Sequence, residues 1–313
     1  MIKGYVLVKK LKSTSEELNF ANFKLWKIGS SYDNDLRKAQ RLFPNAWPLY
    51  EDYVYERAYD NNEREKIPFD IEDTLLLLRL FKTGDIFFVN PCIEAPDGKL
   101  SCQWPYPVMV STHTTNKYII EAKESTKFDS FASEILSLPN WSSGWFKITR
   151  RFFLYGGGKE YNPRHNLVDR IVDYMIVLEA ILVPEKDFVG RRLRERAISL
   201  LKISKMDMDD TKRLLRDFYK VRSSVVHGSD ISAFKDGVLK KIIDFEAVVR
   251  SAIISALRAL PRGDEGRKKF LKQLFDICDQ TRAEYVFNEF CKIKNEDRKG
   301  NCFKRISERI YKS

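Results

Sequence analysis

An arginine and a histidine separated by four residues are the residues best suited to chemistry in this 313-residue chain. Arg222 and His227 lie in segment 219–228, Tyr-Lys-Val-Arg-Ser-Ser-Val-Val-His-Gly, at the end of a strongly amphipathic stretch. Arginine holds phosphate oxygens by bidentate, charge-assisted hydrogen bonds, and histidine can move a proton near neutral pH. Because no set of metal-ligating residues is nearby in the sequence, the pair suggests chemistry on a phosphodiester.

The placement of Arg222 in the predicted helix is unusual, because it shares an apolar stripe with Leu215 and Phe218. A cation on such a face must be paired, lie at an interface or face a cleft. His227 follows about 140° further round an ideal helix. The two side chains therefore share a face only if the last turn before Gly228 is distorted.

A purely structural role is the alternative for the same two residues. Arg222 would then form an ion pair with an acid such as Asp173 or Glu179. His227 would interact favourably with the dipole at the C-terminus of its helix.

Periodic apolar residues predict a helical bundle around the pair. Helices are expected at about 163–183, 189–203, 210–227 and 234–260. Segment 146–155 supplies one more helix or strand, and at least two shorter amphipathic helices follow residue 261.

The first part of the chain has short runs of β-branched and aromatic residues instead, which are typical of strands. Strands are expected at 4–8, 23–28, 53–57, 85–89 and 118–120, with a turn at 96–98, whereas 71–81 fits a helix or a buried strand. We therefore predict an α+β protein in three parts. They are an N-terminal mixed domain over 1–143, an all-α bundle over 144–262 and a basic helical C-terminal extension over 263–313.

The charge balance indicates a polyanionic partner. The formal net charge is +11 and the sequence pI is about 9.2, which favours nucleic acid first and an anionic membrane surface second. Hydrophobic residues make up 43% of the chain, enough for real cores and against disorder.

The cysteines and apolar segments indicate a cytoplasmic protein. The five cysteines are odd in number and lack the spacing of a zinc knuckle, so reduced thiols are the simplest interpretation. The apolar run 5–8 is too short for a secretion signal. Segment 171–183 is too short and too charged to span a bilayer.

The order of these features resembles the HEPN superfamily, and specifically its Apea-like branch. The resemblance covers about residues 145–260: Leu178-Glu179-Ala180 within an apolar helix, then a basic helix, then the string Arg222-Ser-x-x-Val-His227-Gly, then a long final helix. Residues 1–143 look like the region that often precedes such domains.

This resemblance implies a dimeric helical bundle in which two Arg-x4–6-His motifs form one composite site. Many members are metal-independent endoribonucleases of toxin or antiviral-defence systems, which leave 2′,3′-cyclic phosphate and 5′-hydroxyl ends. For this chain it implies that His227 is the general acid or base and that Arg222 stabilises charge on the phosphate. RNA, tRNA included, is the expected substrate, the chain is expected to form a homodimer, and no metal or other cofactor is expected.

The residues around the pair depart from the family pattern at two positions. Ser223 follows the arginine where active members often have Asn, Asp or His, and Ser229 replaces a tyrosine that serves some toxin members as a target for nucleotide transfer. Ser223 can still hydrogen-bond a phosphate or orient the histidine. Together with Ser224 and Tyr219 it forms the predicted supporting set.

Basic side chains near the pair are candidates for contacts with the RNA backbone. They are Arg191, Arg192, Arg194, Arg196 and Lys220. A solvated helix face is the alternative for the arginine cluster. The C-terminal segment 290–311, with cations between aromatic residues, fits either single-strand binding or ordinary amphipathic helices.

Three further features have simpler interpretations. The glycine run at 156–158 is expected to be a mobile hinge, with phosphate binding as the alternative, because it lacks the spacing of a phosphate loop. His113 and His165 are expected to be structural.

Two other functions fit the sequence. The bundle can be a non-catalytic module that dimerises or binds RNA or protein, with Ser223 marking lost chemistry. Alternatively, residues 1–143 can act as a sensor for a phage or host trigger that releases the nuclease site.

Overall fold

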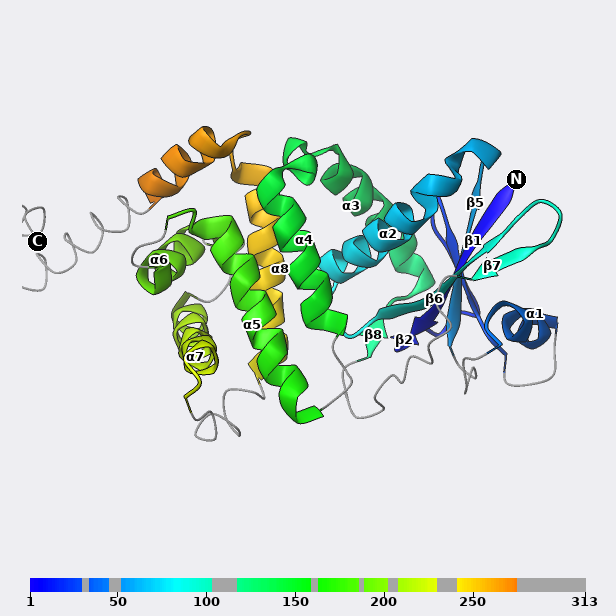
Figure 1. Cartoon of the computed structure of the whole chain (residues 1–313), viewed down its shortest axis with the longest axis horizontal. Helices are drawn as coiled ribbons and strands as arrows, with labels where there is room; N and C mark the ends of the chain where they lie inside the picture. Colours follow the sequence, from blue (N-terminus) through cyan, green and yellow to red (C-terminus); the bar gives the residue numbers. More distant parts are fainter. Residues whose placement is uncertain are drawn as a thin grey trace, which may run out of the picture.

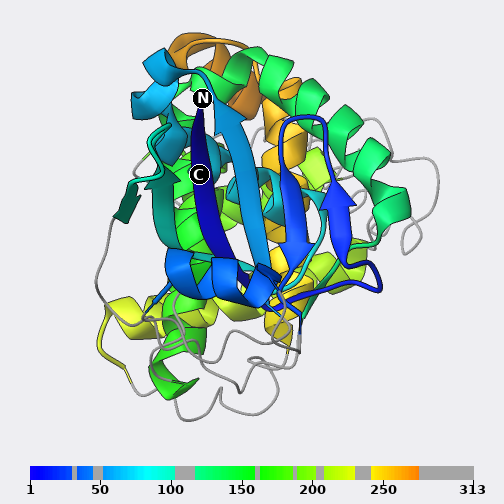
Figure 2. The ribbon, with the colours of Figure 1, turned by 90° about the vertical axis from the view of Figure 1, so that its right-hand side faces the viewer.

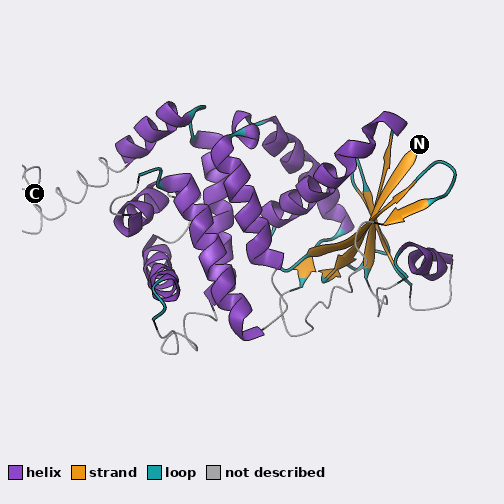
Figure 3. Ribbon diagram, in the orientation of Figure 1, coloured by secondary structure: helices purple, strands orange, loops and turns teal. Residues whose placement is uncertain are grey.

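The computed structural model describes residues 1–29, 34–44, 52–102, 117–158, 163–185, 189–201, 208–229 and 241–274. It has a mixed α+β architecture, with a sheet in the N-terminal part and helices beyond it (Figures 1 and 3). The α+β class and the sequence order of sheet and helices are therefore confirmed.

Six strands form the main sheet, in the order β3-β4-β5-β1-β6-β7, and all neighbours are antiparallel. The strands are β1 (Ile2–Lys9), β3 (Glu17–Asn19), β4 (Lys24–Lys27), β5 (Tyr53–Tyr59), β6 (Phe87–Glu94) and β7 (Leu100–Cys102). A short parallel pair joins β2 (Leu11–Lys12) to β8 (Tyr118–Ile119). Each of the five predicted strand segments overlaps one of these strands.

Both faces of the sheet are covered, because successive side chains of a strand point to opposite faces. On β1, Tyr5 and Leu7 pack against α1 (Asn34–Leu42), while Val6 and Val8 belong to the larger core on the side of α2 (Ile67–Phe81). Figure 2 shows α1 lying across the strands, with the other helices behind the sheet. Segment 71–81, ambiguous in the sequence, is part of the helix α2.

Cys92 on β6 is disulfide-bonded, so the prediction of reduced thiols is wrong at this position. In the strand register, the residue opposite Cys92 is Cys102 on β7. This pairing depends on the register of β6 and β7, which the spacing of the cysteines in the sequence does not reveal.

Helices make up the rest of the described chain. They are α3 (Ser125–Ser137), α4 (Gly144–Gly158), α5 (Pro163–Leu182), α6 (Val189–Leu201), α7 (Met208–Val226), α8 (Ile242–Ala259) and a helix over 264–274, with short 3-10 turns η1 (Asn61–Lys66), η2 (Ala122–Glu124) and η3 (Pro139–Ser142). Helix α5 contacts α4, α6, α7 and α8, so it forms the centre of this part. The predicted helical residues 202–203, 234–240 and those after 274 lie outside the described residues.

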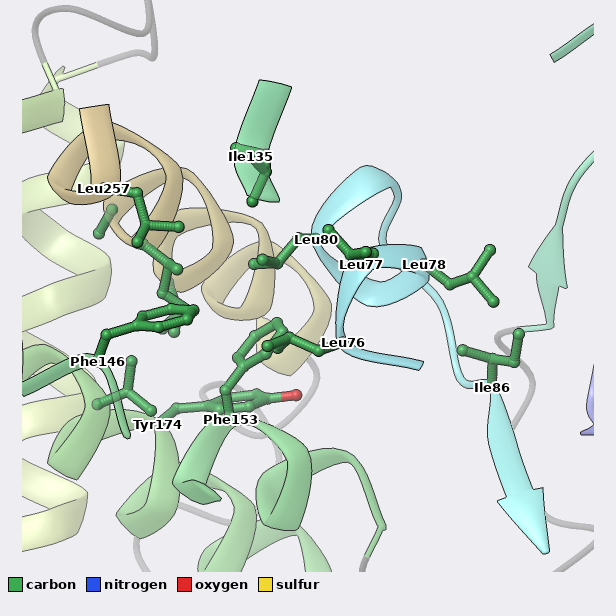
Figure 4. Close-up of a cluster of buried hydrophobic side chains, with 14 of the residues drawn as sticks. Leu76, Leu77, Leu78, Leu80, Ile86, Ile135, Phe146, Phe153, Tyr174 and Leu257 are labelled. Carbon is green, nitrogen blue, oxygen red and sulfur yellow. The ribbon is translucent and has the colours of Figure 1, made fainter. Parts of the chain in front are cut away.

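One hydrophobic core runs from the sheet into the helices. Figure 4 shows side chains of α2, such as Leu76 and Leu80, beside Phe146 and Phe153 of α4 and Tyr174 of α5. The boundary predicted near residue 143 is therefore crossed by continuous packing.

Helices α4 and α5 approach closely at Gly156. This glycine is buried in the last turn of α4, so interpreting residues 156–158 as a hinge or a phosphate loop is wrong. A β-carbon added at Gly156 would lie 2.6 Å from Cε1 of Tyr174. The glycine is thus needed for helix packing.

We expect Gly156→Ala to lower the free energy of unfolding by about 1–3 kcal/mol, because the methyl group overpacks a fully buried tyrosine. Gly144→Ala on the same helix is the matched control, since a β-carbon there meets nothing within 4 Å. Chemical denaturation of both variants measures the difference. Equal free energies of unfolding for the two variants would show that α4 and α5 can move apart to accommodate the added methyl group without loss of stability.

Candidate functional site

The end of α7 holds the predicted catalytic residues. The backbone N–H of His227 donates to the carbonyl of Ser223 (3.1 Å), that of Gly228 to Val225 (3.2 Å) and that of Ser229 to Ser224 (2.8 Å). With Gly228 at φ +68°, these bonds form the Schellman arrangement of a helix C-terminus. His227 therefore occupies the C-cap position, where its side chain is exposed.

Arg222 is held by an acid of the neighbouring helix α5. Its guanidinium donates to Oε2 of Glu179 at 3.1 Å, and the two side chains are 24% and 20% exposed. The predicted pairing of Arg222 with an acid is thus confirmed for Glu179. The other candidate, Asp173, is buried near Gly156 on the α4 side of α5.

The Arg222–Glu179 pair is incompletely satisfied. Nε of Arg222 and Oε1 of Glu179 are buried and have no hydrogen-bond partner among the described residues. Burial raises the pKa of Glu179 above its usual value, and Arg222 opposes this shift. The pair therefore retains unused hydrogen-bonding capacity on both sides.

One chain does not bring Arg222 and His227 together. The hydrogen bond from His227 to Ser223 keeps an ordinary helical spacing, so the distortion considered for the last turn is not observed. On a regular helix the two side chains leave the axis about 140° apart. Arg222 faces α5, whereas His227 faces outward.

The predicted supporting residues surround the helix end. Ser223 and Ser224 are half-buried and supply two of the carbonyls that accept the terminal N–H groups. Tyr219 is also half-buried, and its ring lies against Gly190 at the start of α6, where an added β-carbon would be 2.6 Å from the ring. This contact fixes the start of α6 next to the last two turns of α7.

The basic residues of α6 differ in their environments. Arg191 is exposed and pairs with Glu195 at 3.1 Å, and Arg192 and Arg194 are half-buried. Arg196 is only 2% exposed, donates to the carbonyl of Leu182 and binds both carboxylate oxygens of Glu185. Its expected place among exposed RNA-binding cations is therefore wrong.

On α7, Lys220 is exposed, as an RNA-binding residue must be.

A buried ionic network was missed by the sequence analysis. Arg170 on α5 donates to Glu246 on α8 (2.5 Å) and to Asp85 just before β6 (2.9 Å). Arg79 on α2 lies 3.5 Å from Glu246 and donates to the hydroxyl of Tyr174 (2.9 Å). All five side chains are buried. Because Asp85 and Arg79 belong to the N-terminal part and the other three to α5 and α8, the network joins the sheet region to the helical bundle.

The electrostatics of the network are those of a charge cluster that stays ionised. Burial disfavours the carboxylate of Glu246, but the positive charges of Arg79 and Arg170 bring its net pKa below the usual value. Burial raises the pKa of Tyr174 to about 12. The sequence signal was charged residues within apolar helical stripes, such as Arg170 and Glu246, which rarely lie in a core unpaired.

Arginines from distant parts of the chain also hydrogen-bond to carbonyls at helix ends. Arg250 of α8 donates to the carbonyls of Leu80 (3.2 Å) and Phe81 (2.8 Å), at the end of α2. Arg267 donates to Ala180 and Ile181, at the end of α5. These bonds satisfy carbonyls that a helix leaves unpaired at its C-terminus.

The remaining candidates are only partly covered by the structure. His113 and segment 290–311 lie outside the described residues, and the side chain of His165 is likewise outside them. Among the described residues, no three His, Cys, Asp or Glu side chains converge as a metal site. None of the described helices is long and apolar enough to cross a bilayer.

A scan against protein-family models finds no match to this sequence, and searches of curated proteins and of solved structures find no significant similarity. The HEPN resemblance therefore depends on the sequence features around Arg222 and His227 and stays a prediction.

Proposed function

We propose that this protein is a metal-independent endoribonuclease of the HEPN type. The observation that carries the proposal is that the end of α7 presents an exposed histidine, His227, and, at position 222 of the same helix, an arginine that Glu179 holds in a half-buried position. Histidine supplies proton transfer and arginine supplies charge stabilisation, the two functions that phosphodiester cleavage requires.

The geometry of α7 supports a site made by two copies of the chain. Because Arg222 and His227 leave the helix about 140° apart, one chain does not present both to the same phosphate. Two helices α7 across a two-fold axis would place the arginine of one copy near the histidine of the other. Val226, an exposed apolar residue beside His227, is available for such a contact.

In the proposed reaction, one His227 accepts the proton of the ribose 2′-hydroxyl as its oxygen attacks the adjacent phosphorus. The bond from phosphorus to the 5′-oxygen breaks, and the same His227, now protonated, donates its proton to that oxygen. Arg222 stabilises the negative charge on the pentacoordinate phosphate. The products are a 2′,3′-cyclic phosphate and a 5′-hydroxyl end, and His227 returns to its starting protonation state.

We extend the proposal to cellular context on the sequence features alone. The nuclease would act in the cytoplasm on RNA such as tRNA, in anti-phage defence or a toxin-like stress response. Residues 1–143 would receive a phage or host trigger, and the buried network around Arg170 would link them to the bundle.

The test is an assay of the purified full chain on total RNA and tRNA in EDTA, with mapping of the ends. We expect cleavage that leaves cyclic phosphate and 5′-hydroxyl ends, and none with the double variant Arg222→Ala/His227→Ala, which reports contaminating nucleases. If an extract of infected cells is needed for cleavage, the trigger proposal gains support. Equal cleavage by both proteins would reject the proposed site.

A non-catalytic binding module is the second candidate function. The observation that favours it is that Glu179 already neutralises Arg222, while His227 sits at a helix C-terminus, where a cation is stabilised without chemistry. It predicts a folded dimer that binds RNA and cleaves none, in EDTA or with extract.

A further inference from the structure

A line of exposed cations runs along α7 and ends at His227. Arg213 and Arg216 are 62% and 55% exposed, and Lys220 is exposed as well. At 100° per residue, positions 213, 216, 220 and 227 lie within about 60° of one another around the helix. We call Arg213, Arg216 and Lys220 the α7 track.

The dimensions of the α7 track suit a linear polyanion. With a rise of 1.5 Å per residue, its cations follow one another at about 5–6 Å, and His227 lies about 10 Å beyond Lys220. Figure 1 shows α7 at the periphery of the helical part, beside α5 and α6. The helix that carries the track therefore lies at the edge of the described helical part, and the three side chains of the track are exposed.

The acids near the track do not block it. Arg213 pairs with Asp210 (2.8 Å) and Arg216 with its neighbour Asp217 (3.2 Å), and exposed pairs of this kind are weak because water screens them. Lys220 forms no ion pair with any described side chain, and segment 218–229 contains no acid. The cations of the track that lie nearest to His227 are therefore the least neutralised by acidic side chains of α7.

The start of α6 lies against α7. The ring of Tyr219 packs on Gly190, and the next residue of α6 is Arg191. Arg191 is exposed, and its pair with Glu195 is a surface pair on one helix.

We propose that the α7 track binds successive backbone phosphates of single-stranded RNA and leads the strand to His227. This proposal rests on the proposed nuclease function for the identity of the polymer, but it concerns binding and not cleavage. Arg213 and Arg216 were not among the RNA-binding residues predicted from the sequence, and the structure adds that both side chains are exposed on the face that carries Lys220 and His227.

The test compares two variants that lose the same charge. R213Q/R216Q/K220Q removes the track, whereas K66Q/K99Q/K268Q removes three exposed, similarly paired lysines elsewhere. The probe is a labelled single-stranded oligoribonucleotide with 2′-O-methyl groups, which cannot be cleaved by attack of the 2′-oxygen. Its affinity is measured between 50 and 200 mM salt, and circular dichroism checks that both variants are folded.

We expect the track variant to lower the slope of log affinity against log salt by about 2, because each lost phosphate contact removes about 0.7 for a single strand. Wild type and control should then lose about 20-fold more affinity than the track variant over this salt range. Equal slopes for the two variants, or no binding by wild type, would overturn the proposal.

Two further probes separate other occupants. Tighter binding of a duplex of the same sequence would overturn the assignment to a single strand. If R213Q/R216Q/K220Q lost binding to phosphatidylserine vesicles but kept its binding to RNA, the track would be assigned to a membrane surface instead. Because the probe is not cleaved, none of these results depends on whether the wild-type protein is a nuclease.

Discussion

Replacing Glu246 by alanine is expected to lower the free energy of unfolding by about 3–5 kcal/mol, because it leaves buried guanidinium groups without their shared counter-ion. Arg170 is 2.5 Å from Glu246, and Arg79 is 3.5 Å away. Asp85 remains for Arg170, but Arg79 keeps only neutral partners: Tyr174 and the carbonyls of α4. Urea denaturation followed by circular dichroism measures the loss.

Two controls show whether the loss comes from the buried charge. Glu246→Gln keeps the shape and removes only the charge. Arg258→Gln breaks an exposed pair on the same helix, in which Arg258 lies 2.7 Å from Glu134. We expect the exposed pair to contribute less than about 1 kcal/mol. A loss of that size for Glu246→Ala as well would mean that water or a rearranged partner satisfies the arginines.

The same network gives a direction for the pH dependence of stability. The pKa of Glu246 is lowered in the folded chain, so its contribution is fully present above the usual carboxyl pKa of 4.5 and is lost as the pH falls below it. The difference in unfolding free energy between wild type and Glu246→Gln should therefore shrink on acidification below about pH 4.5. A difference that grows in acid would contradict this assignment.

Arg222→Ala and His227→Ala are each expected to reduce RNA cleavage by about 10²–10⁴-fold. An equimolar mixture of the two variants, after subunit exchange, should recover up to about a quarter of wild-type activity. Half of the dimers are then mixed, and each mixed dimer has one intact Arg–His combination of two. Initial rates on a defined tRNA, in EDTA, measure the recovery.

The controls separate catalysis from folding. Arg222→Ala leaves the half-buried carboxylate of Glu179 without its partner, so the variant is repeated with Glu179→Gln, which removes that carboxylate. A mixture of His227→Ala with the double variant Arg222→Ala/His227→Ala contains no His227 and should stay inactive. If the mixture of Arg222→Ala with His227→Ala recovered no RNA cleavage, the site would not combine residues of two chains.

Local sequence patterns predicted the elements that carry the candidate site. Apolar periodicity and Gly228 located the end of α7, and the left-handed backbone at Gly228 explains why the helix stops there. The mixture of β-branched and aromatic residues placed five strand segments correctly. The presence of Arg222 on an apolar stripe indicated that it is paired, lies at an interface or faces a cleft, and in the structure Glu179 of α5 pairs with it.

The features that sequence patterns missed depend on contacts between distant residues. Arg196 looked like one of several surface arginines, but the end of α5 and Glu185 enclose it. Gly156 looked like part of a loop, although the glycine run serves the approach of α4 to Tyr174. Periodicity within one helix contains no information about which neighbour will lie against it, so these residues could not be assigned.

The hydrogen bonds from Arg250 to the end of α2 have a consequence for the timing of synthesis. The two hydrogen bonds span 170 and 169 positions of the sequence, respectively. At about 5–20 residues per second, roughly 10–30 s pass between translation of these two parts of the chain. Arg250 also follows His227 in the sequence. During synthesis, the end of α2 therefore cannot form its hydrogen bonds with Arg250 until every residue of the candidate site has been made.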